Sequence, residues 1–196
     1  MNFMNSMNRL RIKPITTTTT TTNIYKNDGS QLTGWTISGA VTISNTIGIP
    51  TPSISVPNST NCYYNVTGIT TFKNHTIQFD IYTGVGSLIN FYFACNSSGS
   101  GQMFRLETRP NNYSGFINTA SWTTWSAPAS GKTLSPTTWY TIKITVSDLG
   151  VATYTYNGSA IGIGGSGTYT ISDNGTYIGI IGDGITGGYV DNIIIT

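Results

Sequence analysis

The chain has 196 residues, of which 38% are hydrophobic and only 8% charged, and its formal net charge at pH 7 is +2. Globular proteins carry about 25% charged residues, and a net charge this small excludes a nucleic-acid-binding surface over the body of the protein. No apolar run is long enough for a transmembrane helix. With 12 tyrosines and 23 glycines, the composition argues against long helices and predicts short strands joined by turns.

An N-terminal arm, residues 1–22, precedes a globular body over residues 23–196. Apolar residues in the arm are spaced so that one side of a short helix would be apolar: Phe3, Met4, Met7 and Leu10. The threonine run at 16–22 has neither alternation nor turn residues, which favours an extended spacer or a weakly specified edge strand. A helix this short is marginal in water, so the arm is either disordered or orders against another protein subunit. We expect a docking arm, and no signal peptide, because a continuous apolar core and a small-residue cleavage site are absent.

The first part of the body is rich in turns, with short strands expected at 24–26, 35–38 and 40–44, the last two split by Gly39. Three nearby prolines leave Ser53–Val56 as at best an edge strand, because proline cannot donate to a neighbouring strand. Two cysteines, Cys62 and Cys95, are too few for a disulfide framework. Two separate buried thiols are favoured over a single bridge.

Three consecutive strands follow. Thr76–Thr83 alternates apolar and polar residues, which predicts one core face and one solvent face. Ser87–Cys95 is apolar on both faces and is therefore expected in the middle of a sheet. Gln102–Thr108 pairs next, but its core face is ambiguous because Met103 and Phe104 are adjacent.

The strongest hairpin pattern lies further along the chain. Trp139–Val146 alternates strictly over eight residues, the returning strand is Val151–Tyr156, and Asn157 with the following glycine is a strong turn signal. Trp139 and Trp35 are both expected in the core. About a dozen short strands with no helix of three turns predict an all-β, two-sheet antiparallel β-sandwich, most naturally a jelly roll.

Four segments resemble, in order, the concanavalin A-like lectin/glucanase superfamily of laminin-G-like jelly rolls: HTIQFDIYTGVGSLINFYFA, QMFRLETRPNNYSGF, LSPTTWYTIKITVSDLGVATYTYNGSAI and GTYIGIIGDGITGGYVDNIIIT. The resemblance spans residues 23–196; a competing resemblance is to the galactose-binding-like carbohydrate modules. Membership implies a concave sheet face that binds sugars in many members. Some members hydrolyse glycans and many are structural or adhesive, and the fold alone does not choose among these roles.

Catalysis is not predicted. Retaining glycosidases need two carboxylates about 5 Å apart, and the glucanases of this superfamily carry them in a Glu-x-Asp-x-x-Glu cluster. This chain has one glutamate, Glu107, with no aspartate within 25 residues of it. The single histidine, His75, and two distant cysteines give neither a nucleophilic triad nor a zinc spacing. We therefore predict that the protein is not an enzyme.

Calcium is the one ion for which the sequence offers ligands, and no other cofactor is predicted. Asp183 and Asp191 lie in the closing segment. The resemblance implies a structural Ca²⁺ of the kind that related jelly rolls hold through turn carbonyls and an aspartate. The alternative is that Asp183 closes a turn and Asp191 faces solvent or caps an edge.

Aromatic residues indicate a candidate carbohydrate site in the loop-rich stretch after the third of these strands. It comprises Tyr113, Trp122 and Trp125 beside Arg109. Exposed aromatic faces stack on sugar rings, and neighbouring polar groups fix the orientation of the ligand. The alternative is that these rings pack beneath a long loop or at a subunit interface.

Two functions from different classes follow. The leading hypothesis is a non-enzymatic structural or adhesive subunit of a larger assembly, most naturally a minor capsid, decoration or fibre protein of a virion or phage, anchored through residues 1–22. The alternative is a lectin-like module that binds a glycan through its loop aromatics. Either function places the protein on a virion or extracellular surface, without a membrane span and without a nucleic-acid partner.

Overall fold

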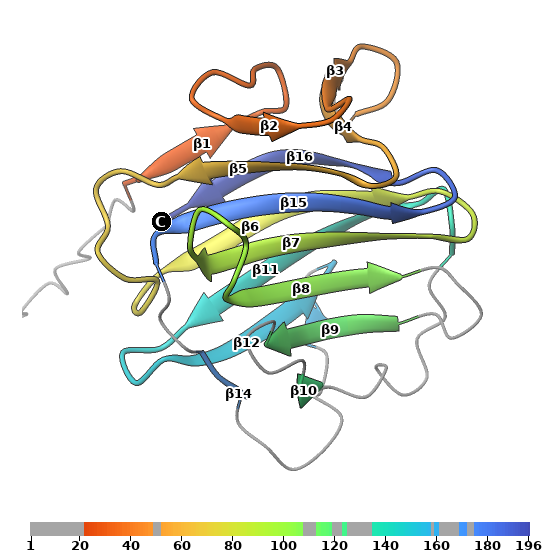
Figure 1. Ribbon diagram of the computed structural model, residues 1–196. Helices are drawn as coiled ribbons and strands as arrows, with labels where there is room; N and C mark the ends of the chain where they lie inside the picture. Colours follow the sequence, from red (N-terminus) through yellow and green to blue (C-terminus); the bar gives the residue numbers. More distant parts are fainter. Residues whose placement is uncertain are drawn as a thin grey trace, which may run out of the picture.

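The computed structural model describes residues 22–48, 52–107, 113–118, 123–124, 135–157, 159–160, 169–171 and 175–196. These residues form sixteen strands and no helix (Figure 1). A helix that could cross a membrane is accordingly not found among them. The strands make two antiparallel sheets that pack face to face, so the predicted all-β sandwich is confirmed.

Sheet A has nine strands in the order β13-β12-β11-β6-β16-β4-β3, with β1 paired to β16 and β14 paired to β12. Their bounds are β1 (Tyr25–Asn27), β3 (Thr42–Ser44), β4 (Ser53–Val56), β6 (Thr76–Thr83), β11 (Trp139–Val146), β12 (Val151–Tyr156), β13 (Ser159–Ala160), β14 (Tyr169–Thr170) and β16 (Gly188–Ile195). The expectation that Ser53–Val56 is at best an edge strand is wrong, because β4 lies between β16 and β3. The prolines flank this strand, so its own backbone N–H groups remain available for pairing.

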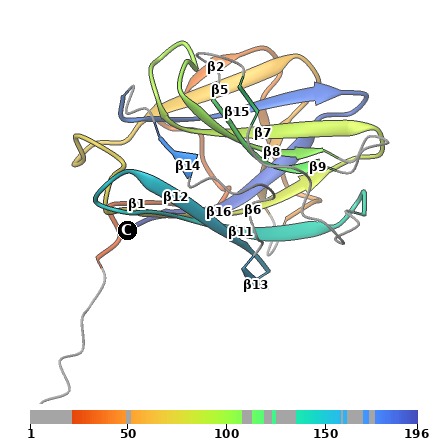
Figure 2. The ribbon, with the colours of Figure 1, turned by 90° about the horizontal axis from the view of Figure 1, so that it is seen from below.

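Sheet B has seven strands in the order β10-β9-β8-β7-β15-β5-β2. Their bounds are β2 (Thr36–Ser38), β5 (Thr60–Asn65), β7 (Ser87–Cys95), β8 (Gln102–Glu107), β9 (Tyr113–Asn118), β10 (Thr123–Thr124) and β15 (Tyr177–Gly184). The mid-sheet position expected for β7 is confirmed, since it pairs with β8 and β15. Figure 2 shows the two layers from below, with β6, β11 and β16 in one and β5, β7 and β15 in the other.

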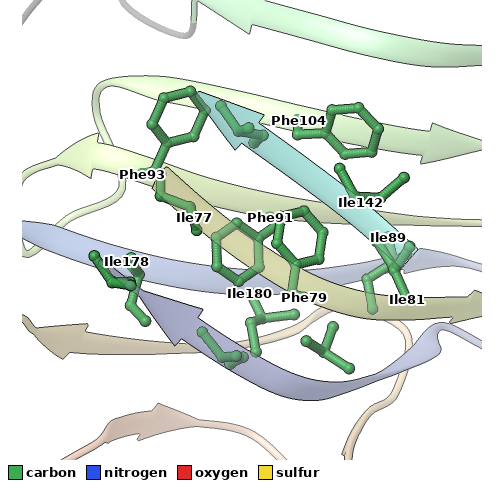
Figure 3. Close-up of a cluster of buried hydrophobic side chains, with 14 of the residues drawn as sticks. Ile77, Phe79, Ile81, Ile89, Phe91, Phe93, Phe104, Ile142, Ile178 and Ile180 are labelled. Carbon is green, nitrogen blue, oxygen red and sulfur yellow. The ribbon is translucent and has the colours of Figure 1, made fainter. Parts of the chain in front are cut away.

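The core fills the space between the sheets with aromatic and branched side chains (Figure 3). Phe79 of sheet A stacks on Phe91 of sheet B with ring centroids 3.9 Å apart and planes 10° from parallel. Phe104 meets Phe79 edge-on at 5.9 Å. Phe104 is fully buried, which settles the ambiguous core face of β8.

The hairpin of β11 and β12 follows its sequence pattern. Every second residue of β11 is buried, namely Tyr140, Ile142, Ile144 and Val146, whereas Lys143 between them is exposed. Asn157, which follows β12, has the positive φ of 46° that was expected of a turn residue. The placement of Trp139 in the core is wrong: it is partly exposed on the outer face of sheet A. Its neighbour Tyr140 occupies the inward position, and successive side chains of a strand point to opposite faces.

Truncation of the central ring is expected to be strongly destabilising. Phe79→Ala removes a fully buried ring that contacts both Phe91 and Phe104, and phenylalanine-to-alanine changes in a core cost about 3–5 kcal/mol. Denaturant unfolding measures the change in the free energy of unfolding. Val85→Ala is the matched control, because Val85 is 65% exposed and should change stability by less than about 0.5 kcal/mol.

Candidate functional site

The outer face of sheet B brings polar residues from several strands into line. Asn90 of β7 lies opposite Arg105 of β8 on one side and Ile181 of β15 on the other. Arg105 in turn lies opposite Gly115 of β9. The residues on either side of Asn90 are fully buried in the core between the sheets, so Asn90 occupies an outward position.

A second row of residues runs parallel to the first on the same face, displaced from it by two residues along each strand. Leu88 of β7 lies opposite Asp183 of β15 and opposite Glu107 of β8. Glu107 lies opposite Tyr113 of β9. The pairing therefore places Tyr113, one of the predicted sugar-binding residues, in one row with Glu107 and Asp183.

An aromatic cluster borders these rows on the same sheet. Tyr63 of β5 and Tyr92 of β7 meet edge-on with ring centroids 6.3 Å apart, and Cys95 packs with them. A Cβ on Gly179 of β15, which lies between the two tyrosines, would come within 2.2 Å of the Tyr63 ring, so the ring lies directly over this glycine. Burial of the Tyr63 hydroxyl raises its pKa.

The outer face of sheet B is not evenly accessible. Although their positions point outward, Asn90 is 4% and Tyr92 6% exposed. Among the side chains of this face that the structure describes, the more open ones lie along β5 and β15, where Asn61 and Ile181 are partly exposed and Asp183 is exposed.

The other predicted partner-binding residues lie outside the residues that the structure describes. They are Arg109, Trp122 and Trp125 of the loop and Phe3, Met4, Met7 and Leu10 of the arm. Their roles stay predictions. Sequence reasoning did not single out Asn90 or Asp183 for sugar binding, because only the pairing of β7 with β8 and β15 puts them on one face with Arg105.

The two aspartates proposed as calcium ligands lie on opposite outer faces of the sandwich. Asp183 is exposed on β15 of sheet B, where one carboxylate oxygen accepts from the N–H of Gly184 at 2.6 Å. Asp191 is fully buried on β16 of sheet A. Because the core separates the two faces, these carboxylates cannot hold one ion together.

Asp191 lies beside an irregular turn that supplies other oxygen atoms. A Cβ on Gly29 would lie 2.8 Å from Oδ1 of Asp191 and 2.6 Å from the carbonyl oxygen of Pro52. The N–H of Gly29 donates to Oδ1 of Asn27 at 2.8 Å, which fixes the turn. Carboxylate and carbonyl oxygens are calcium's usual ligands, and Asp191 and Pro52 offer two of the roughly six to eight oxygens that the ion takes. Oδ1 of Asp191 also accepts from the N–H of Asn192 at 2.6 Å. Within the described part of the chain, no group of three His, Cys, Asp or Glu residues converges.

Both cysteines are buried and unbridged, as the sequence favoured. Cys62 belongs to the core between the sheets, whereas Cys95 belongs to the tyrosine cluster on the outer face of sheet B. Burial raises the pKa of each thiol to about 12. Neither thiol is therefore a nucleophile at neutral pH.

Comparison with known proteins supports the fold. No family model and no curated protein sequence matches the chain. Among solved structures, it is similar to the cellulose-induced protein Cip1, with a TM-score of 0.65 and 13% identity over 88% of this chain and 96% of that one. The carbohydrate recognition domain of Emp47p has a TM-score of 0.57 and 9% identity, over 89% of this chain and 94% of that one. An endo-β-1,4-glucuronan lyase from the fungus Trichoderma reesei has a TM-score of 0.53 and 13% identity, over 89% of this chain and 95% of that one.

These likenesses confirm the lectin-type β-sandwich that the sequence resemblance implied. Identities of 9–13% show the fold alone. The neighbours include both a carbohydrate recognition domain and a carbohydrate-cleaving enzyme, so function depends on the residues of the outer faces.

Thiol reactivity tests the burial of Cys62 and Cys95. Native protein should not react with a thiol-specific disulfide reagent at pH 8, because both pKa values lie about four units higher; both thiols should react in denaturant. Unfolded thiols titrate near pH 8.5. The stability that this burial contributes is thus present below about pH 8.5 and is lost as the pH rises toward 12. Rapid modification of the native protein would contradict the burial.

Proposed function

We propose that the protein is a non-catalytic, lectin-like glycan-binding module whose binding face is the outer face of sheet B. The observation that carries the proposal is the alignment of Asn90, Arg105, Glu107, Tyr113 and Asp183 on adjacent strands of that face. Amide, guanidinium and carboxylate groups supply the hydrogen bonds that orient a sugar, and an aromatic ring supplies a stacking surface. The likeness to a carbohydrate recognition domain supports the same function.

Glycan binding is the second of the two functions that the sequence suggested. The fold likenesses support a glycan-binding module and give no support to a capsid, decoration or fibre protein. Docking of residues 1–22 on another subunit remains a separate hypothesis about the arm. A location on an extracellular or virion surface is part of the proposal, because such glycans are displayed there.

The carboxylates of this face argue for binding rather than cleavage. A catalytic acid needs a carboxyl group that burial keeps protonated near neutral pH. Asp183 is exposed, so it does not have the buried setting of such an acid. The backbones of Glu107 and Asp183 are two strands apart, with Leu88 between them, so these two carboxylates do not stand on neighbouring strands.

A structural calcium ion at Asp191 is a second part of the proposal. The fully buried carboxylate and the Pro52 carbonyl oxygen lie on the same side of Gly29. An ion there would fasten the turn after β1 and the segment before β4 to the last strand. Asp183, on the other sheet, would take no part.

Glycan binding is tested on an array, followed by titration calorimetry with the best ligand. Arg105→Ala and Glu107→Gln should each weaken binding about tenfold or more, because each removes a charged hydrogen-bonding group, worth about 1.5–3 kcal/mol. Lys26→Ala, an exposed charge on β1 of sheet A, should leave binding unchanged. Wild-type protein that binds no glycan would refute the proposal, and release of new reducing ends would refute the absence of catalysis.

Calcium binding is tested by thermal unfolding with calcium and with a chelator. Calcium at about 100 times its dissociation constant should stabilise the wild type by about 2.7 kcal/mol. Asp191→Asn should abolish this calcium-dependent shift, whatever its effect on basal stability, whereas Asp183→Asn should retain it. Equal melting temperatures of the wild type in both buffers would count against the site.

A further inference from the structure

A row of three aromatic residues crosses the outer face of sheet A, on the side of the sandwich opposite to the proposed glycan site. Trp139 of β11 lies directly opposite Tyr82 of β6, which lies directly opposite Tyr189 of β16. The ring centroids of Trp139 and Tyr82 are 5.4 Å apart, and those of Tyr82 and Tyr189 are 5.6 Å apart. We call these three residues the aromatic strip.

The strip is part of the surface and not of the core. The residues next to the strip residues along their strands are buried. Tyr140 is 4% exposed, and Ile81 and Val190 are 0% exposed. Each strip residue is partly exposed. The three rings form a continuous, partly exposed aromatic surface on one face of the sheet, and contiguous exposed apolar patches are found at binding sites.

The row continues beyond the strip without a bulky side chain. Ser55 of β4 lies opposite Tyr189, and Thr42 of β3 lies opposite Ser55. Ser55 is partly exposed and Thr42 is exposed. Five adjacent strands about 4.8 Å apart give a track of roughly 19 Å, with aromatic rings at one end and hydroxyl groups at the other.

A polar row lies beside the strip, two residues along the strands. Asp80 is the central member, and its two carboxylate oxygens accept from Oγ1 of Thr141 at 2.6 Å and from Nδ2 of Asn192 at 2.8 Å. Asn157 accepts from the N–H of Thr141 at 2.9 Å and is exposed. Asp191 of β16 lies opposite Asp80 in the same row. The row therefore holds two carboxylates, a hydroxyl and two amides in fixed positions next to the rings.

The nearest described cation on this face is Lys143, in the row beyond Thr141 and Asp80. The strip itself has no positive charge, which disfavours an anionic lipid surface or a nucleic acid. Aromatic rings next to fixed hydrogen-bonding groups suit a ligand with alternating C–H faces and hydroxyl edges. An extended neutral polysaccharide has this chemistry.

We propose that the aromatic strip and its polar row form a second glycan-binding surface, which takes a β-1,4-linked neutral polysaccharide laid across the strands of sheet A. Equatorial linkages in such chains leave flat C–H faces for stacking. The ring planes of the strip are inclined by 48° and 73° to one another. They do not form one flat plane, so a single twisted chain fits better than a crystalline surface.

The test is titration calorimetry of the full chain with cellohexaose and xylohexaose, with cellobiose for comparison. At least one hexasaccharide should bind, and more tightly than cellobiose, because the track is longer than a disaccharide. Trp139→Ala and Tyr189→Ala should each weaken binding about tenfold, since each removes one stacking ring. Tyr82→Phe, which keeps the ring, should change binding less than about twofold.

The inference does not depend on the proposed site on sheet B. In an Arg105→Ala background, the strip should still bind the hexasaccharide, and adding Trp139→Ala should then weaken this binding about tenfold. Circular dichroism and thermal unfolding verify that each variant is folded; if an alanine variant does not fold, Trp139→Ser serves in its place. Failure of the wild type to bind either hexasaccharide would overturn the proposal, as would unchanged affinity on loss of Trp139 or Tyr189. A strip that instead mediates self-association, seen as a dimer that Trp139→Ala dissociates, would also overturn it.

Discussion

The stacked pair of Phe79 and Phe91 holds the two sheets of this protein together. One ring comes from β6 of sheet A and the other from β7 of sheet B, and their centroids lie 3.9 Å apart. Because side chains alternate along a strand, fixing these two rings inward also fixes which residues of both strands point outward. Tyr82 on one face and Asn90 on the other are outward residues for this reason. The core thereby determines both candidate binding surfaces.

Much of this arrangement could be predicted from the sequence. Strict alternation in Trp139–Val146 predicted a half-buried strand, and the apolar run of Ser87–Cys95 predicted a central one; both are confirmed. The prediction that Trp139 lies in the core was wrong. Its place in the alternation put it with Thr141 and Lys143 on the outer face, but its residue type favoured the core. In a strand with one buried face, the periodicity decides, because a side chain cannot change face without shifting the register.

The candidate sites could not be predicted in the same way, because they depend on which strands are neighbours. Tyr113 was singled out from its own loop, yet the row in which it lies also contains Glu107 and Asp183, which are far from it in sequence. Similarly, the closing segment suggested a pair of calcium ligands in Asp183 and Asp191. The turn between β15 and β16 carries the chain from one sheet to the other, and this separates the two carboxylates.

The two outer faces differ in a way that bears on how they can act together. The described part of the sheet B face is enclosed along β7, where Asn90 is only 4% exposed, whereas the aromatic strip on sheet A is partly open. An enclosed face suits recognition of a short glycan segment, since buried polar groups discriminate strongly against imperfect partners. An open track suits attachment anywhere along a chain. With the rigid core between them, sites on opposite faces cannot grip one stretch of a glycan. They can engage two chains, or two segments of a flexible chain, and the second contact then gains from the high local concentration that the first creates.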